Sequence, residues 1–199
     1  MAIKLIGSGD FLFEGGRQTR SGAPPFEGLV SLSPEEQVQL AVILKRKGEK
    51  EYLRAGSVDF AFYFKENGSC NLVIRDYVDR RTSYFPLSPV EQEELRRMIL
   101  VSLDGTDLSL YLEGNLIEKG HGEERVRVNG VLVPTEECWR LATALELGAR
   151  YSFHTGSLSI EAGFSYEISK YVLSSESALK LQAVFESASL EFRPYFVGI

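Results

Sequence analysis

Tyrosines alternate with basic side chains in the middle of the chain, and this combination can bind a single nucleic-acid strand. Tyr63 and Lys65 fall two positions apart on one predicted strand, and Arg75 and Tyr77 do the same on the next. Alternate residues of a strand point to the same face of a sheet, so these four side chains are expected to lie together. Tyrosine rings stack on bases, while lysine and arginine attract phosphates. With three neighbours added, the predicted nucleic-acid-binding residues are Tyr63, Lys65, Arg75, Tyr77, Arg80, Arg81 and Tyr84.

An ordinary solvent-facing hairpin would explain the same residues. Tyr–Arg pairs across two strands stabilise a sheet without any ligand. Asp59, Asp76 and Asp79 also lie nearby in the sequence and weaken a positive potential. The sequence therefore leaves two interpretations of this face open, a binding site and a plain surface.

Residues that could carry catalysis are few. The two histidines, His121 and His154, have no cysteine, histidine or carboxylate at the spacing of metal ligands. Cys138 falls on the inner side of a predicted helix, where burial is its expected role, and Cys70 falls in a turn. No phosphate-binding loop, dinucleotide fingerprint, serine elbow or paired-carboxylate motif is present. We therefore expect a protein that is not an enzyme and that uses no metal and no cofactor.

The chain has 199 residues and a formal net charge of −6, which is unevenly distributed. Residues 1–100 hold 14 basic and 14 acidic side chains, whereas residues 101–199 hold 8 basic and 14 acidic ones. This balance argues against a nucleic-acid-binding protein that is basic over its whole surface. A local basic face in the first half remains compatible with it.

The cysteine count and the lengths of the apolar runs indicate the cellular location of the protein. Two cysteines are too few for a disulfide framework. No apolar run approaches the roughly 18 residues of a membrane span. The apolar run at the N-terminus is too short for a signal peptide. We expect a cytoplasmic protein that does not enter a membrane.

Four segments, residues 32–40, 87–95, 133–141 and 173–181, carry the same pattern typical of a helix start. Each has an apolar residue, a Ser, Thr or Pro step, an acidic first turn, and a second apolar residue eight positions after the first. A side-chain oxygen caps free backbone N–H groups, proline fits the first helical position, and acids favour the positive end of the helix dipole. The pattern predicts an internal repeat, with helices at 34–47, 89–102, 135–147 and 175–188.

Alternating apolar residues and turn signals predict sheet segments before each helix. Residues 15–25 are predicted to be a flexible loop because they combine turn residues with no apolar anchor. Two halves, 1–103 and 104–199, each an antiparallel sheet with helices on one face, fit this order better than a solenoid. The expected fold class is α+β, with the halves tightly packed or merged into one compact domain. The predicted strands are 2–6, 10–14, 26–32, 58–65, 71–79, 82–87, 108–112, 125–128, 150–162, 164–173 and 189–197.

Residues 72–80, LVIRDYVDR, and residues 84–95, YFPLSPVEQEEL, form a strand followed by a strand-to-helix passage. This passage resembles the positive cofactor four family of single-stranded DNA-binding proteins, with its Ile-Arg-Glu-Tyr-type strand and its Leu-Ser/Asn-Pro helix entry. The helix entry is also similar to that of the Whirly family, whose chains carry two sheet-and-helix units in tandem. The resemblance covers residues 57–103 best. Gln92 stands where many members carry tryptophan, and the Lys-Gly-Lys-Ala motif of Whirly chains is absent.

The resemblance implies a mostly antiparallel sheet whose helix-free face binds a single strand of DNA or RNA. It also implies that the helices of the two halves pack on one another, as the subunits of the positive cofactor four dimer do. Further self-association into a homo-oligomer is left open.

A second function remains open on the sequence alone. A compact, acidic chain without catalytic motifs suits a non-catalytic protein-binding module, such as a phage-type inhibitor or adaptor. Its acidic second half would then bind a basic protein partner.

Overall fold

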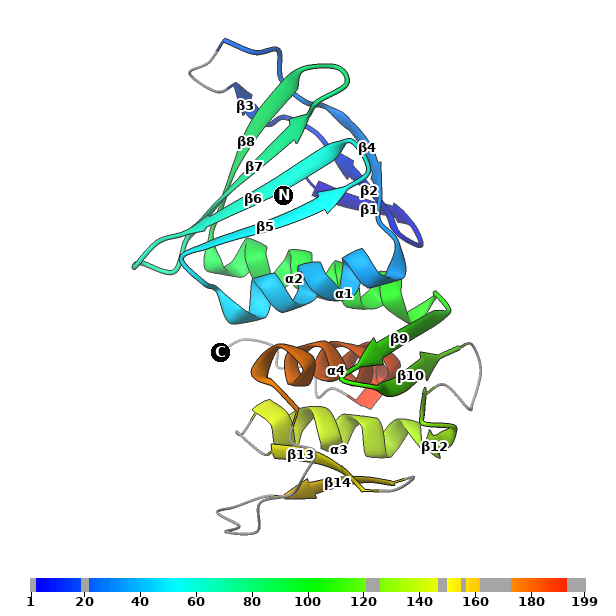
Figure 1. Cartoon of the computed structure of the whole chain (residues 1–199). Helices are drawn as coiled ribbons and strands as arrows, with labels where there is room; N and C mark the ends of the chain where they lie inside the picture. Colours follow the sequence, from blue (N-terminus) through cyan, green and yellow to red (C-terminus); the bar gives the residue numbers. More distant parts are fainter. Residues whose placement is uncertain are drawn as a thin grey trace. The chain divides into compact units, whose positions relative to one another are not determined.

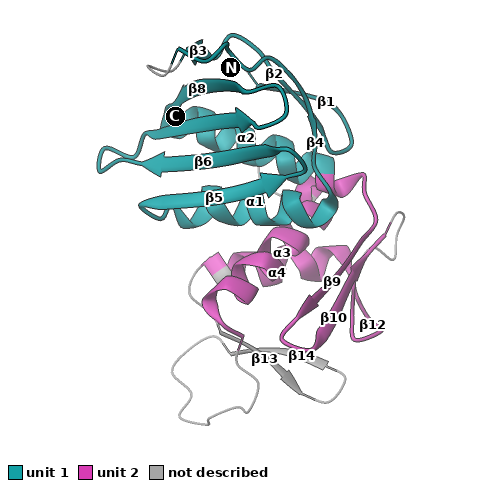
Figure 2. Ribbon diagram, turned by 45° about the horizontal axis from the view of Figure 1, so that its top comes forward, with its two compact units in different colours: residues 1–102 teal, residues 103–199 magenta. Residues whose placement is uncertain are grey.

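A computed structural model shows an α+β protein that divides into two compact units, residues 1–102 and residues 103–199 (Figure 2). The α+β fold class predicted from the sequence is thereby confirmed. The structure describes residues 3–18, 22–120, 126–146, 150–154, 157–161 and 173–192.

Unit 1 contains two antiparallel sheets and two helices (Figure 1). One sheet has the strand order β1-β2-β4, and the other has the order β3-β8-β7-β6-β5. Its elements are β1 (Ile3–Gly7), β2 (Asp10–Phe13), β3 (Arg17–Gln18), β4 (Gly28–Ser31), α1 (Pro34–Arg46), β5 (Lys50–Ala55), β6 (Val58–Phe64), β7 (Cys70–Asp76), β8 (Arg81–Leu87) and α2 (Pro89–Asp104), whose last turn crosses into unit 2.

One face of the five-stranded sheet is buried, and phenylalanines dominate it. Phe13 of β2 reaches this face, and its ring centroid lies 5.7 Å from that of Phe60 and 5.9 Å from that of Phe85. α1 and α2 lie along the same side of the sheet (Figure 1). Burial of such large apolar side chains is the main force that holds the sheets and helices together. The buried side chains of this face are Leu53, Ala55, Val58, Phe60, Phe62, Cys70, Leu72, Ile74, Ser83, Phe85 and Leu87.

The start of α1 forms the cap that its sequence predicts. The Ser33 hydroxyl accepts a hydrogen bond from the backbone N–H of Glu36, and the Glu36 carboxylate accepts one from the backbone N–H of Ser33. The start of α2 repeats both contacts with Ser88 and Glu91. Each pair satisfies backbone donors that the helix itself leaves free.

A buried glutamine joins each of these helix starts to the strand before it. The Nε2 group of Gln37 donates to the carbonyl oxygen of Leu32 at 3.0 Å, and that of Gln92 donates to the carbonyl oxygen of Leu87 at 3.2 Å. Gln92 also donates to the carbonyl oxygen of Gly68, in the turn between β6 and β7. These bonds fix the angle at which the sheet meets each helix, because the glutamines are almost fully buried.

Unit 2 contains a four-stranded antiparallel sheet with the order β12-β11-β10-β9, and a separate hairpin, β13-β14. Helix α3 packs against α4, and α4 packs against β10. The elements are β9 (Leu108–Leu112), β10 (Asn115–Lys119), β11 (Val126–Val128), β12 (Val131–Val133), α3 (Thr135–Glu146), β13 (Arg150–His154), β14 (Ser157–Glu161), α4 (Ser175–Ala188) and a 3-10 turn (Leu190–Phe192).

The two helices of unit 2 begin with variants of the same arrangement. In α3, Cys138 takes the position of the glutamine, and its Sγ lies 3.7 Å from the carbonyl oxygen of Val133. In α4, the Ser174 hydroxyl accepts from the backbone N–H of Ser177. The acid that accepts from the Ser174 backbone N–H is Glu113, which comes from the turn between β9 and β10. The local pattern therefore predicts all four helices, while the partners that complete it differ.

A buried lysine caps the C-terminal end of α2. The Nζ of Lys119, on β10, donates to the carbonyl oxygens of Leu103, Asp104 and Thr106 at 2.7, 2.9 and 3.2 Å. The side chain is only 2% exposed. Its positive charge faces the negative end of the helix dipole and supplies donors for carbonyls that the helix leaves free.

Several predicted strand boundaries are wrong. The strand predicted at 71–79 ends at Asp76, because the Asp76 carboxylate accepts from the backbone N–H of Val78 and starts a turn. The strand predicted at 150–162 is instead the hairpin of β13 and β14. The predicted loop 15–25 contains β3, which pairs with β8.

Other elements were missed or fall outside the described residues. β5, β10 and β12 were not predicted from the sequence, although each pairs in register with a predicted strand. The strand predicted at 189–197 begins as a 3-10 turn instead, and its remainder lies outside the described residues. The strand predicted at 164–173 also lies outside them, except for Leu173.

Removing the capping hydroxyl of α1 should destabilise the protein. Ser33→Ala is expected to lower the free energy of unfolding by about 1 kcal/mol, because the Glu36 N–H loses its acceptor. Urea unfolding followed by circular dichroism measures this change. Ser33→Thr is the matched control, since it keeps the hydroxyl and should restore most of the stability. Equal stability of Ser33→Ala and wild type would contradict the cap.

Removing the buried lysine should cost more. Lys119→Met removes three hydrogen bonds to carbonyl oxygens, of which that of Leu103 still accepts from Thr106, and we expect a loss of about 1–3 kcal/mol in the free energy of unfolding. Lys4→Met is the control, because Lys4 forms an exposed ion pair with Glu14, and such pairs contribute about 0–1 kcal/mol. If both variants lose the same stability in urea, the role given to Lys119 is wrong.

Candidate functional site

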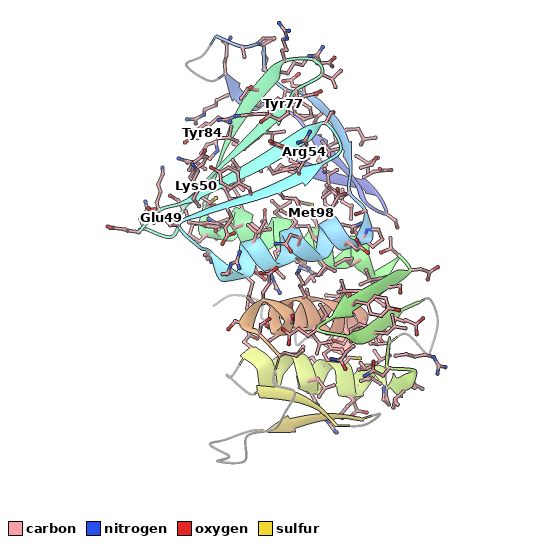
Figure 3. The ribbon with its side chains drawn as sticks, in the orientation of Figure 1. Glu49, Lys50, Arg54, Tyr77, Tyr84 and Met98 are labelled. Atoms are coloured by element: carbon pink, nitrogen blue, oxygen red, sulfur yellow. The ribbon has the colours of Figure 1, made fainter. Side chains whose placement is uncertain are left out.

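The face of the five-stranded sheet opposite the buried core carries polar and aromatic side chains, and we call it the open face. Lys50, Arg54, Tyr77 and Tyr84 lie spread over the sheet in Figure 3. Successive side chains of a strand point to opposite faces of the sheet, so the residues between the buried ones point to the open face. The open face consists of Arg17, Lys50, Tyr52, Arg54, Asp59, Ala61, Tyr63, Asn71, Val73, Arg75, Thr82, Tyr84 and Pro86.

The register of the strands arranges these side chains in three rows across the sheet. The middle row begins at Tyr52 and ends at Tyr84 and Arg17, with Ala61 and Val73 between the two rings. Strands lie about 4.8 Å apart, so the Cα atoms of Tyr52 and Tyr84 are separated by roughly 14 Å. Ala61, between the two rings, is buried beneath its neighbours, and Val73 is half-buried.

Lys50 sits between two tyrosines at one corner of the open face. Its Nζ lies 5.1 Å from the ring centroid of Tyr52 and 5.2 Å from that of Tyr63. A hydrogen bond with Tyr52 raises the pKa of Lys50, while the same bond lowers the pKa of the Tyr52 hydroxyl. The charge of Arg75 adds a smaller lowering of the pKa of Tyr52. The ammonium group therefore draws both rings together by cation–π attraction and hydrogen bonding.

A second polar group lies toward the opposite end of the strands. The Tyr77 hydroxyl donates to Oδ2 of Asp59 at 2.8 Å, so the tyrosine lies over β6 from the turn that follows β7. The Nε of Arg54 lies 3.8 Å from Oδ1 of the same carboxylate. Asp59 is the only carboxylate among the described strand residues of this face, and Tyr77 and Arg54 both lie against it.

Four of the seven predicted site residues meet on the open face. Tyr63, Arg75 and Tyr84 lie on neighbouring strands, and Tyr77 joins them through its bond to Asp59. The sequence alone places these side chains on one face through period-two counting, and the structure brings them together.

The other three predicted residues lie elsewhere. Lys65 is in the turn after β6, where its backbone pairs with Ser69 and Gly68, so it lies beyond Phe64, the last residue of the strand. Arg80 has a positive φ of 53° in the turn between β7 and β8. Arg81 pairs with Asp76 and belongs to the same alternate set of β8 residues as the buried Ser83 and Phe85, not to the open-face set. Its Nε lies 4.0 Å from Oδ2 of Asp79. All three lie outside the strand positions that form the open face, and their predicted role in binding stays a prediction.

One side of the open face was not among the predicted binding residues. Lys50, Tyr52 and Arg54 alternate along β5, and Arg17 sits opposite Tyr84 on β3. The signal was present as the alternation Lys-x-Tyr-x-Arg in residues 50–54. It was overlooked because this segment has few apolar residues and follows directly on a helix.

The charges of unit 1 are separated, although they balance to zero over residues 1–102. The open face carries four cations, Arg17, Lys50, Arg54 and Arg75, against the single carboxylate of Asp59. Many acids are engaged away from this face, at the helix starts of α1 and α2 or in ion pairs such as that of Glu51 with Arg46. This separation gives the open face a positive potential within a neutral unit.

The remaining chemically reactive side chains are buried or lie outside the described residues. Cys70 and Cys138 are fully buried, and desolvation raises the pKa of their thiols to about 11 and about 12, respectively. Such thiols are protonated at neutral pH and are poor nucleophiles. His121 and the side chain of His154 lie outside the described residues.

Neither a cluster of metal ligands nor a membrane-spanning helix occurs among the described residues. They contain no cluster of three or more histidine, cysteine, aspartate or glutamate side chains suited to a metal ion. Within the same part of the chain, every helix is too short or too polar to cross a membrane.

Comparison with protein-family models, with curated proteins and with solved structures gives no match for this chain. The geometry of the open face is therefore the basis for a function.

Replacing Lys50 should change how Tyr52 titrates. Lys50→Met removes the ammonium that lowers the pKa of Tyr52, so this tyrosine should ionise at a higher pH than in wild type. An ultraviolet absorbance titration of tyrosinate measures the difference. Lys65→Met is the control, because Lys65 lies in a turn away from Tyr52. The same titration curve in wild type and Lys50→Met would show that the two side chains do not interact.

Proposed function

We propose that this protein binds a single strand of DNA or RNA on its open face. The observation that carries the proposal is the combination of exposed tyrosines and cations on neighbouring strands, with Lys50 held between Tyr52 and Tyr63. Sequence-tolerant binding of single strands uses the same two elements, aromatic rings for the bases and a positive surface for the phosphates. No bond is made or broken in this function, and no cofactor is needed.

The positions of the side chains suggest how a strand would lie. Tyr52, Tyr63 and Tyr84 can each stack on a base, and the shorter side chains of Ala61 and Val73 lie between Tyr52 and Tyr84 in the same row. Arg54 and Arg75 lie in the row next to that of Tyr52 and Tyr84, and Arg17 lies on the edge strand β3. All three could reach phosphates of a nucleic-acid strand that crosses the face. A duplex would hide its bases from these rings, so the proposal is for single strands.

The proposal also draws on the resemblance to the positive cofactor four family, which implies a mostly antiparallel sheet whose helix-free face binds a single strand. The proposed binding mode is similar in kind, because it uses the sheet face without helices. The contact residues proposed for this chain come from its own structure and include Lys50, Tyr52 and Arg54, which the resemblance did not indicate.

Binding should depend strongly on salt and on the open face. Fluorescence anisotropy with a labelled oligothymidylate should give a slope of log K against log salt of roughly −3, if the four cations each contact a phosphate. Arg75→Ala should weaken binding and reduce the magnitude of that slope by about 0.7. Tyr52→Ala should cost about 1–3 kcal/mol of binding free energy through lost stacking.

Matched variants in unit 2 control for these changes. Arg140→Ala removes an exposed arginine that pairs with Glu136 on α3, and Tyr111→Ala removes a tyrosine that is 71% exposed on β9. Neither should alter binding. Absence of binding at low salt, or equal losses from the controls, would contradict the proposal and favour the protein-binding alternative.

A further inference from the structure

One amide in an outer row of the open face, the row that contains Lys50 and Tyr63, is held in a fixed orientation. The Tyr84 hydroxyl donates a hydrogen bond to Oδ1 of Asn71 at 2.7 Å. The amide oxygen is thereby occupied, and the Nδ2 group of the same side chain is left as a donor. No acceptor among the described residues takes a hydrogen bond from this Nδ2.

The surroundings of Asn71 are those of a place where a base could stack. Asn71 lies directly opposite Tyr63 on β6, at a cross-strand separation of about 5 Å. On its other side the Tyr84 ring reaches it diagonally from β8. Asn71 and both tyrosines are partly exposed. A base stacked on either ring would bring one of its edges to the amide.

We propose that Asn71, oriented by Tyr84, makes the open face favour bases that present a carbonyl oxygen over bases that present an amine at the same place. Thymine and uracil carry O4 there and guanine carries O6, which accept a hydrogen bond from Nδ2. Cytosine carries the N4 amine and adenine the N6 amine, and these donors would meet the donor of the amide. The inference rests on the proposed function and adds a preference among bases to it.

The size of the preference follows from a single neutral hydrogen bond. Such a bond contributes roughly 0.5–1.5 kcal/mol, so the discrimination should be about three- to tenfold. Stacking and phosphate contacts do not distinguish these bases strongly, since every base has a flat face and the same backbone. The preference should therefore reside in Asn71 and not in the cations.

Three homopolymers of equal length, made of thymidine, deoxycytidine and deoxyadenosine, test this inference by competition for the wild-type protein. We expect thymidine to bind about three- to tenfold more tightly than the other two. Asn71→Asp replaces the donor with a second acceptor, so the order should reverse in favour of deoxycytidine and deoxyadenosine. Asn71→Ala should remove the preference altogether.

Two further variants separate base recognition from charge and from structural support. Thr82→Asp adds a carboxylate on the same face, opposite Arg75, and should weaken all three polymers while keeping their order. Tyr84→Phe keeps the ring but frees the amide to turn, so the preference should shrink while the affinity for thymidine changes by less than about threefold.

The outcomes distinguish the two proposals. Binding of none of the homopolymers at low salt overturns both the proposed function and this inference. Binding of all three with equal affinity, or an unchanged order in Asn71→Asp, overturns the inference alone and leaves the proposed function standing. A reversed order in Asn71→Asp, with the order kept in Thr82→Asp, supports it.

Discussion

The hydrogen bonds between each helix start and the preceding strand are the constraint on which the rest of unit 1 depends. Gln37 and Gln92 are buried and donate to the carbonyl oxygens of Leu32 and Leu87, so neither helix can turn relative to its strand without leaving a buried group unpaired. The bond from Gln92 to Gly68 adds the hairpin of β6 and β7 to the same arrangement. The helices are thereby held on one side of the sheet, and the other side remains free.

The same caps explain where the negative charge of unit 1 goes. Glu36 and Glu91 accept hydrogen bonds from Ser33 and Ser88, and their position near the positive end of a helix dipole stabilises them there. The hydrogen bonds from Ser88 lower the pKa of Glu91 accordingly. Carboxylates that serve as caps are fixed away from the open face, which is one reason that a unit without net charge can present a cationic surface.

Local patterns in the sequence were enough to predict the helices, and period-two alternation was enough to place Tyr63, Arg75 and Tyr84 on one face. Alternation did not show where a strand ends. β6 ends before Lys65, and β7 ends at Asp76, whose carboxylate accepts from the backbone N–H of Val78; period-two alternation does not specify these hydrogen bonds. Arg81 pairs with Asp76 and therefore has the parity of the buried face. The contribution of β5 depends on its pairing with β6, which places Lys50 opposite Tyr63 at the open end of their hairpin.

The two cysteines have a practical consequence. One lies in each compact unit, both are fully buried, and both thiols have raised pKa values. An alkylating reagent reacts with the thiolate and needs access to it, so the folded chain should resist modification at either position. Each cysteine becomes reactive only when the structure around it opens. Mass spectrometry of partly modified protein could therefore follow the opening of the two units separately, with no engineered label.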